Sequence, residues 1–396
     1  MYLRVGDYVK KSRRLLKDMD MTLLIVTLIL FIVGLLNIVN ASSQAVVLRY
    51  GTGIYHYFLH HLLSLFIGLI AFIFIINVPT KKYHNGLFTF IYLGELGLLM
   101  YLYMFGKSYL GSVNWIKIAG FSLQPSELAK PIMIIAVSLL FEKFCSRLRN
   151  NKKYTRSDHY KMIGIIILIG ALYPGLVFLQ KDLGTTIILV GIFSVLFLTS
   201  PIQASEKFQT ILAVIVALII GAFVLSIKSN GNLLSEEQKS RLDFYDPCSS
   251  YEEGGYQTCN GFIAINSGGL FGVGIGNSKQ VSYLPESHTD SVFAIFAEEF
   301  GFIGGTIIIV LYLIVLYRIF DLASHVTEIR NKYICLGIGT YIFIHIFINL
   351  GGLFGMMPLT GVPLPFLSYG GTYTITLICS LAIVQRIHIE KRREKM

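Results

Sequence analysis

Charged residues are scarce in this sequence of 396 amino acids. Only 14% of the residues are Asp, Glu, Lys or Arg, whereas 54% are hydrophobic, and the mean hydropathy is +0.65. Average soluble domains carry about 25% charged residues. The shortage of charge therefore excludes an ordinary soluble protein and indicates an integral membrane protein.

Several ligand-binding patterns are also missing. The five cysteines show no metal-ligand spacing. The glycine-rich run 264–276 fits neither the dinucleotide fingerprint nor the P-loop, and it follows no predicted strand. We therefore expect no cysteine metal site and no nucleotide cofactor, although the glycines indicate close backbone packing. No internal repeat or low-complexity tract is present, so one membrane domain is the simplest organisation.

Apolar runs long enough to cross a hydrocarbon core of about 30 Å as helices recur along the whole chain. We predict an all-α polytopic membrane protein with about ten transmembrane helices. The expected spans are 21–39, 58–78, 86–106, 127–145, 161–179, 184–200, 208–226, 291–318, 333–352 and 371–388. The first span could also be a signal peptide ending near Ala41, but its apolar stretch exceeds the usual core of about 7–15 residues.

Lys and Arg residues gather in the loops of one predicted side. An inside N-terminus places the basic residues of 1–20, 81–82, 143–156, 318–332 and 389–396 in the cytoplasm. The chain then divides into a cytoplasmic basic N-terminus (1–20), a transmembrane domain (21–388) and a cytoplasmic tail (389–396). The formal net charge of +10 reflects this topology and attraction to anionic lipids. We therefore expect a protein of the cytoplasmic membrane with no nucleic-acid partner.

The long segment 227–290 becomes an extracellular loop between the seventh and eighth helices in this topology. Cys248 and Cys259 lie in this loop. They could form a disulfide that closes about a dozen residues and stabilises the loop by roughly 3 kcal/mol. They could equally remain two free thiols.

A polar block precedes the fourth apolar span. Residues 124–130 predict a helix start with Pro125 in the first turn. Glu127 and Lys130 lie three residues apart on one helix face, close enough to pair. Without a functional role, this block would be a helix entry with Trp115 as an interfacial anchor.

Two further segments interrupt the apolar pattern. Asp182, in a short turn at 180–185, is either a solvated turn charge or a buried acid that faces the bundle. The segment 357–372 holds three prolines within eight residues, which excludes a regular helix. Irregular backbone near membrane depth is tolerated only when protein covers it or when it lines a wet cavity. We therefore expect this segment to fold back over the bundle.

The most informative stretch runs from residue 284 to 301. It places Glu286, His288 and Asp290 where the long polar loop meets an apolar helix. Ionisable groups at such a depth are costly and indicate function. His288 could be a second proton carrier, a metal ligand or a structural partner of the carboxylates.

Three other acids lie within apolar spans. At least one of Glu298 and Glu299 is expected to make a buried hydrogen bond that fixes its helix. Glu95 has no assigned role.

Taken in their order along the chain, these motifs resemble those of the SEDS family (shape, elongation, division and sporulation). This family of polytopic cell-wall proteins includes FtsW, RodA and SpoVE. The similarity covers nearly the whole chain. It rests on the blocks 115–116, 124–127, 182–185, 255–257, 267–269, 284–290, 298–299 and 363–371. Residues 349–352 lean towards the FtsW-like division type.

The resemblance implies a peptidoglycan glycosyltransferase that polymerises lipid II, the undecaprenyl-linked disaccharide-pentapeptide, at the outer face of the cytoplasmic membrane. In the family, the acid of the His-Thr-Asp motif is the best catalytic candidate. Here that acid is Asp290, and Glu286 is the second candidate. The residues expected to bind substrate are Trp115, Lys117, Glu127, Lys130, Asp182, His288 and Ser368.

This chain departs from the family pattern at several motif positions. Asn114 stands where relatives usually carry Arg before the Trp, and Lys181 replaces a proline before the Asp of the turn motif. Ser291 replaces the usual Phe after His-Thr-Asp. Relatives tend to carry Gln and Ser at the positions of Cys259 and Asn260.

The expected chemistry is consistent with this assignment. Forming the glycosidic bond requires a base that deprotonates the acceptor 4-hydroxyl, and a carboxylate can serve. The leaving diphosphate needs positive charge or a divalent cation such as Mg or Mn. Lys117, Lys130 and Lys181 are the candidate cations.

Two other functions, a flippase and a noncatalytic scaffold, are alternatives to the transferase. A flippase for the same lipid would suit the glycine-broken segments and buried acids, but we detect no inverted repeat, and the polar motifs cluster on one predicted face. A noncatalytic scaffold for the division or elongation machinery would tolerate replacement of Asp290. The resemblance implies a class B penicillin-binding protein transpeptidase and other divisome or elongasome proteins as partners.

Overall fold

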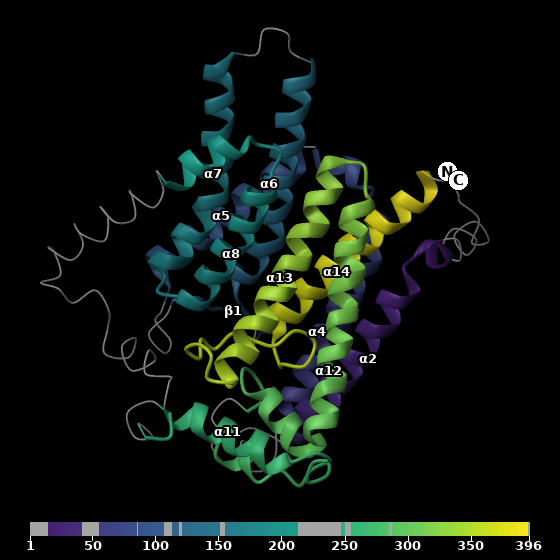
Figure 1. The fold of residues 1–396 in the computed structure, drawn as a ribbon, viewed down its shortest axis with the longest axis vertical. Helices are drawn as coiled ribbons and strands as arrows, with labels where there is room; N and C mark the ends of the chain where they lie inside the picture. The colour runs from purple at the N-terminus through teal and green to yellow at the C-terminus, as the bar shows by residue number, and fades with distance from the viewer. Residues whose placement is uncertain are drawn as a thin grey trace, which may run out of the picture.

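A computed structural model describes residues 15–41, 55–84, 86–106, 113–118, 121–150, 155–212, 247–249, 255–284 and 287–394. The long helices run up and down in one bundle (Figure 1). They are α2 (Met21–Ala41), α4 (His56–Ile76), α5 (Gly86–Phe105), α6 (Pro125–Asn150), α7 (Arg156–Leu179), α8 (Leu183–Thr199), α12 (Val292–His325), α13 (Ile329–Leu353) and α14 (Gly371–Glu394). The shorter elements are η1 (Thr80–His84), β1 (Ile116–Ile118), β2 (Phe121–Leu123), α11 (Tyr256–Gly268) and η3 (Gln280–Ser282).

The helices confirm the predicted fold class. Nine of the ten expected spans fall on the long helices from α2 to α14. By length and composition, 7 helices among the described residues could cross a membrane. The expected span 208–226 lies mostly outside the described residues, and its first part, up to 212, is helical.

The predicted single span at 291–318 was wrong in one respect, because the backbone breaks at Gly301. Gly301 has φ 68° and ψ −170°, a left-handed region that favours glycine. A side chain there would collide with the backbone of Gly272 and Leu270. Residues 292–300, of which 292–299 are buried, therefore form a separate helical segment before the break.

Glu298 and Glu299 hold the loop that follows α11. Glu298 accepts hydrogen bonds from the hydroxyls of Ser267 and Ser278 and from two backbone N–H groups at 279 and 280. Glu299 accepts from the Gly276 N–H at 2.9 Å. These contacts confirm the expected fixing role. They also show that the predicted loop 227–290 contains a helix, α11, and an ordered turn region.

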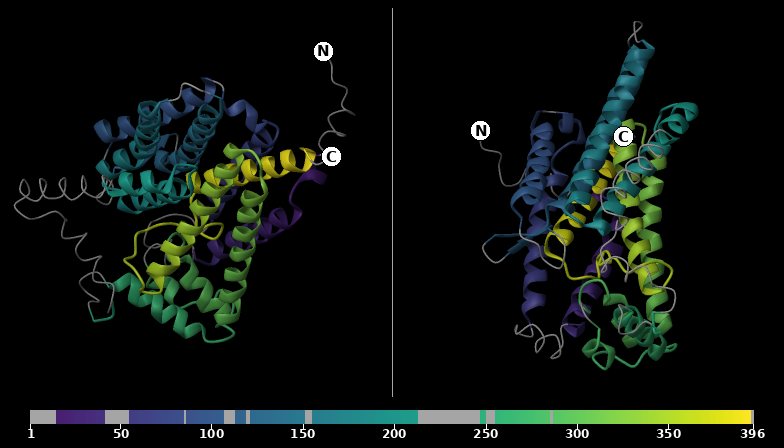
Figure 2. Two further views of the ribbon diagram at one scale, coloured as in Figure 1. Left: turned by 45° about the horizontal axis from the view of Figure 1, so that its top comes forward. Right: turned by 90° about the vertical axis from the view of Figure 1, so that its left-hand side faces the viewer.

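Ion pairs gather at the end of the bundle where the basic segments lie. Arg318 pairs with Asp20 at 2.7 Å, which joins the end of α12 to the start of α2. Arg393 pairs with Asp18 at 2.8 Å. The start of α2 and the end of α14 lie at this end, and the upper parts of α6 and α7 project beyond the other helices there (Figures 1 and 2). We call this the basic end; α11 lies at the opposite end, and β1 lies between the two (Figure 1).

A disulfide joins Cys248 to Cys259 in α11, with Cα atoms 5.0 Å apart. This resolves the alternative that the sequence left open. The bond ties the described residues 247–249 to the first half of α11. The other cysteines, Cys145, Cys335 and Cys379, are free.

Replacing Cys248 and Cys259 together by serine should loosen this attachment. Closing a loop of this length stabilises it by about 3 kcal/mol in the chain-entropy picture. Hydrogen exchange should therefore become faster in the first turns of α11 in the double variant, and a reductant should reproduce the effect in the wild type. The reductant should change nothing further in the variant. Unchanged exchange in both proteins would contradict the prediction.

Candidate active site

Asp290 lies in the turn that leads into α12, and its side chain is buried. Gln257, in the first turn of α11, donates from Nε2 to Asp290 Oδ1 at 3.0 Å and to Ser291 Oγ at 2.9 Å. Ser291 thus shares the Gln257 amide with the carboxylate. The position of the Asp290 carboxylate therefore depends on α11.

Asn349 fixes the backbone of the same turn from α13. Its Nδ2 donates to the carbonyls of Asp290 and Val362, each at 2.8 Å. One amide thus connects the Asp290 turn to the irregular segment 354–370. Gly361 in that segment has φ 70°, and a Cβ added there would lie at an ordinary van der Waals distance, 3.9 Å, from Asp290 Oδ2.

Ser368 makes a second connection between these two segments. Its hydroxyl donates to the Thr289 carbonyl and accepts from the Leu364 N–H at 2.7 Å. The Tyr369 N–H donates to the His288 carbonyl at 2.8 Å. The segment therefore folds back over the bundle as predicted, and it braces the His-Thr-Asp turn.

Glu127 and Lys130 form the predicted pair, buried between helices. The Lys130 ammonium lies 2.7 Å from Glu127 Oε2 and 3.0 Å from His345 Nε2. Because an ammonium can only donate, Nε2 accepts, and Nδ1 of His345 donates to the Pro363 carbonyl at 3.1 Å. A continuous chain of contacts therefore runs from α6 through α13 to the irregular segment.

Asp182 caps α8 and gathers the residues around it. Its carboxylate accepts from the N–H and hydroxyl of Thr185, each at 3.0 Å. Asn114 and Gln124 donate to Asp182 Oδ2 at 3.0 Å and 3.2 Å. Of the two sequence-based alternatives, the structure supports a partly buried acid with protein partners. Asn114, which the sequence marked as a departure from the expected pattern, serves as one of those partners.

The segment 360–362 lies between the two acids. A side chain at Gly184, two residues after Asp182, would lie 3.0 Å from the Thr360 carbonyl and 3.3 Å from Val362. The same segment is joined to the Asp290 turn by Asn349, which donates to the carbonyls of Asp290 and Val362. The structure thus brings the 124–130, 180–185, 287–291 and 357–372 motifs into one region, which we call the candidate active site.

His288 packs against aromatic rings at the edge of this region. Its ring centroid lies 4.1 Å from that of Tyr57 in α4 and 5.6 Å from that of Tyr369. Burial raises the pKa of Tyr369 to about 12, so its hydroxyl stays protonated at neutral pH. These contacts place the His288 ring among aromatic side chains at the edge of the candidate active site.

The remaining residues singled out from the sequence are Trp115, Lys117, Glu286 and Glu95. Trp115 is 39% exposed and directly precedes β1. Lys117 lies in β1, where its backbone pairs with Ser122; its side chain lies outside the described part of the chain, as does Glu286. Glu95 is buried in α5, and its Oε1 has no hydrogen-bond partner among the described residues.

Sequence reasoning missed His345 and did not assign roles to Gln257 and Asn349. His345 and Asn349 are four residues apart, so they lie on one face of the largely apolar helix α13. Two polar residues in that spacing on a buried helix were the available signal. Gln257 belongs to the block 255–257, which is one of the motifs on which the family resemblance rests.

Asn349→Ala should reduce the activity of the candidate active site at least tenfold, because two buried carbonyls lose their donor and Asp290 loses its backbone support. Steady-state kinetics with purified protein would measure this. Asn277→Ala is the matched control, since Asn277 Nδ2 also bonds a carbonyl, that of Val273, but at an exposed site. Equal activity in the two variants would refute the positioning role of Asn349.

The fold and site together define a class, namely a polytopic helical membrane protein with an oriented, buried carboxylate and ion-paired side chains between its helices. The FtsW/RodA/SpoVE family model, described as cell cycle protein, matches residues 20–393, and the chain belongs to this family. This confirms the resemblance found in the sequence.

Individual relatives match almost the entire chain. It is 31% identical over 384 residues to the probable peptidoglycan glycosyltransferase FtsW of Bacillus subtilis, covering 95% of this chain and 92% of that protein. Identity to the stage V sporulation protein E of the same organism is 31% over 372 residues, covering 93% and 96%. These two values do not separate a division role from a sporulation role.

Solved structures share the fold. A chain in a structure of a peptidoglycan synthase complex superposes with a TM-score of 0.70 at 22% identity, covering 94% of this chain and 98% of that chain. The rod shape determining protein RodA of Thermus thermophilus gives a TM-score of 0.64 at 22% identity, covering 94% and 97%.

Proposed function

We propose that this membrane protein is a peptidoglycan glycosyltransferase that polymerises lipid II into glycan strands, in cell division or in the maintenance of cell shape. Membership of the FtsW/RodA/SpoVE family supports the activity. The observation that carries the mechanism is the Asp290 carboxylate, oriented by Gln257 and supported through its backbone by Asn349.

Asp290 acts as the general base in this proposal. It removes the proton from the acceptor 4-hydroxyl as that oxygen attacks the anomeric carbon of the donor sugar, and the bond from that carbon to the donor diphosphate breaks. A positioned base of this kind contributes about 10²–10⁴-fold. Glu286 remains the second candidate for the same role.

The leaving diphosphate needs compensating positive charge. Lys117 and Lys181 are proposed to supply it, with Trp115, Asp182, His288 and Ser368 forming the surrounding substrate site. Lys130 is a weaker candidate for direct contact because its buried ammonium lies between Glu127 and His345. We propose that this pair acts mainly by holding the irregular segment in place.

A divalent cation is also proposed. No group of three or more His, Cys, Asp or Glu side chains among the described residues could hold a metal. Mg²⁺ is commonly bound by one or two carboxylates together with substrate phosphates, so Mg²⁺ or Mn²⁺ would be bound jointly by the lipid II diphosphate and an acid such as Asp182. Activity lost with a chelator and restored by added Mg²⁺ would support this role; full activity in the chelator would refute it.

The charge distribution supports a proposal for the orientation, and the comparisons support one for the partner. We propose that the basic end faces the cytoplasm, with both termini inside, and that the candidate active site faces outwards. A class B penicillin-binding protein transpeptidase is the proposed partner, supported by the similarity to a chain of a peptidoglycan synthase complex.

The competing flippase function is tested with the same protein. Wild-type protein is reconstituted into vesicles with labelled lipid II, and both polymer and lipid translocation are measured. Glycan polymer without accelerated translocation supports the transferase. Translocation without polymer, in vesicles that also contain the partner transpeptidase, would show a flippase instead of a transferase. The absence of both polymer and translocation would support a noncatalytic scaffold.

A further inference from the structure

A cavity of about 920 Å³ lies at the basic end of the bundle. Helix α6 supplies most of its lining residues, α5 and α7 supply others, and residues 327–329 at the junction of α12 and α13 complete the lining. No residue of the candidate active site lines it. Its apolar side chains include Phe88, Leu139, Leu140 and Ile169.

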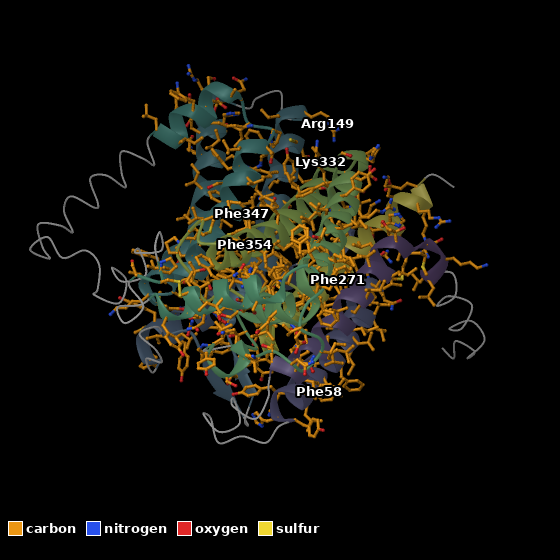
Figure 3. The ribbon with its side chains drawn as sticks, turned by 60° about the horizontal axis from the view of Figure 1, so that its bottom comes forward. Phe58, Arg149, Phe271, Lys332, Phe347 and Phe354 are labelled. Carbon is orange, nitrogen blue, oxygen red and sulfur yellow. A yellow bond between two sulfur atoms is a disulfide. The ribbon has the colours of Figure 1, made fainter. Side chains whose placement is uncertain are left out.

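The last turns of α6 bring three cations to this cavity. Lys143, Arg147 and Arg149 line it, and all three are exposed. Figure 3 shows Arg149 towards the same end of the molecule as Lys332 and far from Phe58. Among the described residues, no salt bridge joins any of the three to an acid.

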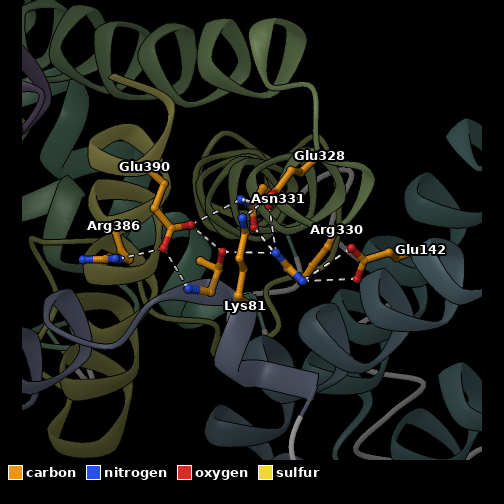
Figure 4. Close-up of polar contacts among 8 residues, drawn as sticks. Lys81, Glu142, Glu328, Arg330, Asn331, Arg386 and Glu390 are labelled. Carbon is orange, nitrogen blue, oxygen red and sulfur yellow. Dashed lines mark hydrogen bonds and ion pairs between the residues drawn. The ribbon is translucent and has the colours of Figure 1, made fainter. Parts of the chain in front are cut away.

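The two acids that also line the cavity are already paired. Arg330 reaches Glu142 at 3.3 Å and Glu328 at 2.8 Å, and Lys81 lies 3.8 Å from Glu328 (Figure 4). Their negative charge is therefore compensated from outside the cavity lining by Arg330 and Lys81. The three cations of α6 remain as excess positive charge.

We propose that this cavity binds an anionic phospholipid from the leaflet on the basic side. The phosphate would lie against the three cations of α6, and an acyl chain would lie against the apolar lining. Ligand sites commonly measure about 300–1,000 Å³, and basic pockets between membrane helices suit anionic head groups. A charged rim joined to an apolar interior is the complement of such a lipid.

Native mass spectrometry of the purified full chain, titrated with phosphatidylglycerol, tests the proposal. In the double variant Lys143→Gln/Arg149→Gln, binding should weaken on the order of 30-fold, because each removed cation accounts for about fivefold. The control Arg156→Gln/Lys161→Gln removes the same charge at the same end but outside the cavity lining. It should stay within about twofold of the wild type.

Two further probes identify the ligand class. Phosphatidylcholine and inorganic phosphate should each bind far more weakly than phosphatidylglycerol, because the site needs both net negative charge and an acyl chain. Equal weakening in the cavity and control variants would overturn the proposal by showing general charge attraction. Inorganic phosphate binding as tightly as the lipid would overturn it by making the acyl chain irrelevant.

Discussion

Asp290→Asn should lower glycan polymerisation by a factor of about 10²–10⁴ while leaving the protein folded. Asparagine keeps the size of the side chain, and its Oδ1 can still accept from Gln257. It cannot accept the proton of the acceptor hydroxyl. The loss should therefore appear in kcat, with the KM for lipid II nearly unchanged.

Ser291→Ala is the matched control for this prediction. Ser291 shares the Gln257 amide with Asp290, so the variant perturbs the same hydrogen-bond group without removing a base. We expect a fall of less than about tenfold. If Ser291→Ala were as inactive as Asp290→Asn, orientation by Gln257 rather than proton transfer would explain both results.

Lys130→Met should destabilise the fold by about 3–5 kcal/mol. The substitution removes the partner of Glu127 and leaves a carboxylate that is 2% exposed without its cation. It also removes the donor to His345, which in turn contacts the Pro363 carbonyl. Thermal unfolding in detergent, followed by circular dichroism, measures the change.

The double variant Glu127→Gln/Lys130→Met separates structure from substrate binding. Removing both charges should recover a large part of the lost stability, because no buried charge remains unpaired. If the recovered protein also regains activity, the pair acts through the fold. A stable double variant with a strongly raised KM for lipid II would instead show that Lys130 contacts the substrate diphosphate.

The sequence was sufficient for the helices because long apolar runs have one stable form in a bilayer. It also located the polar motifs, since a pair such as Glu127 and Lys130 stands out in an apolar chain. The break at Gly301 was missed because the glycine lies inside a stretch that was expected to form one uninterrupted helix, 291–318. Its left-handed backbone depends on the approach of Gly272 from a distant loop.

The connections within the site could not be predicted in the same way. Asn349 joins Asp290 to Val362, and His345 joins Lys130 to Pro363, so each contact spans separate segments of the chain. Local spacing shows that two residues share a helix face but not what that face meets. The lipid cavity was hidden for the same reason, since three helices and a turn combine to form it.

Glycan formation by purified protein most directly tests the central claim that this chain is a transferase with Asp290 as its base. Wild-type protein and Asp290→Asn, each reconstituted with the partner transpeptidase, are given equal lipid II, and the products are separated by length. The account predicts long glycan strands from the wild type and none above background from the variant. Equal strands from both proteins would contradict it and would move the search for the base to Glu286.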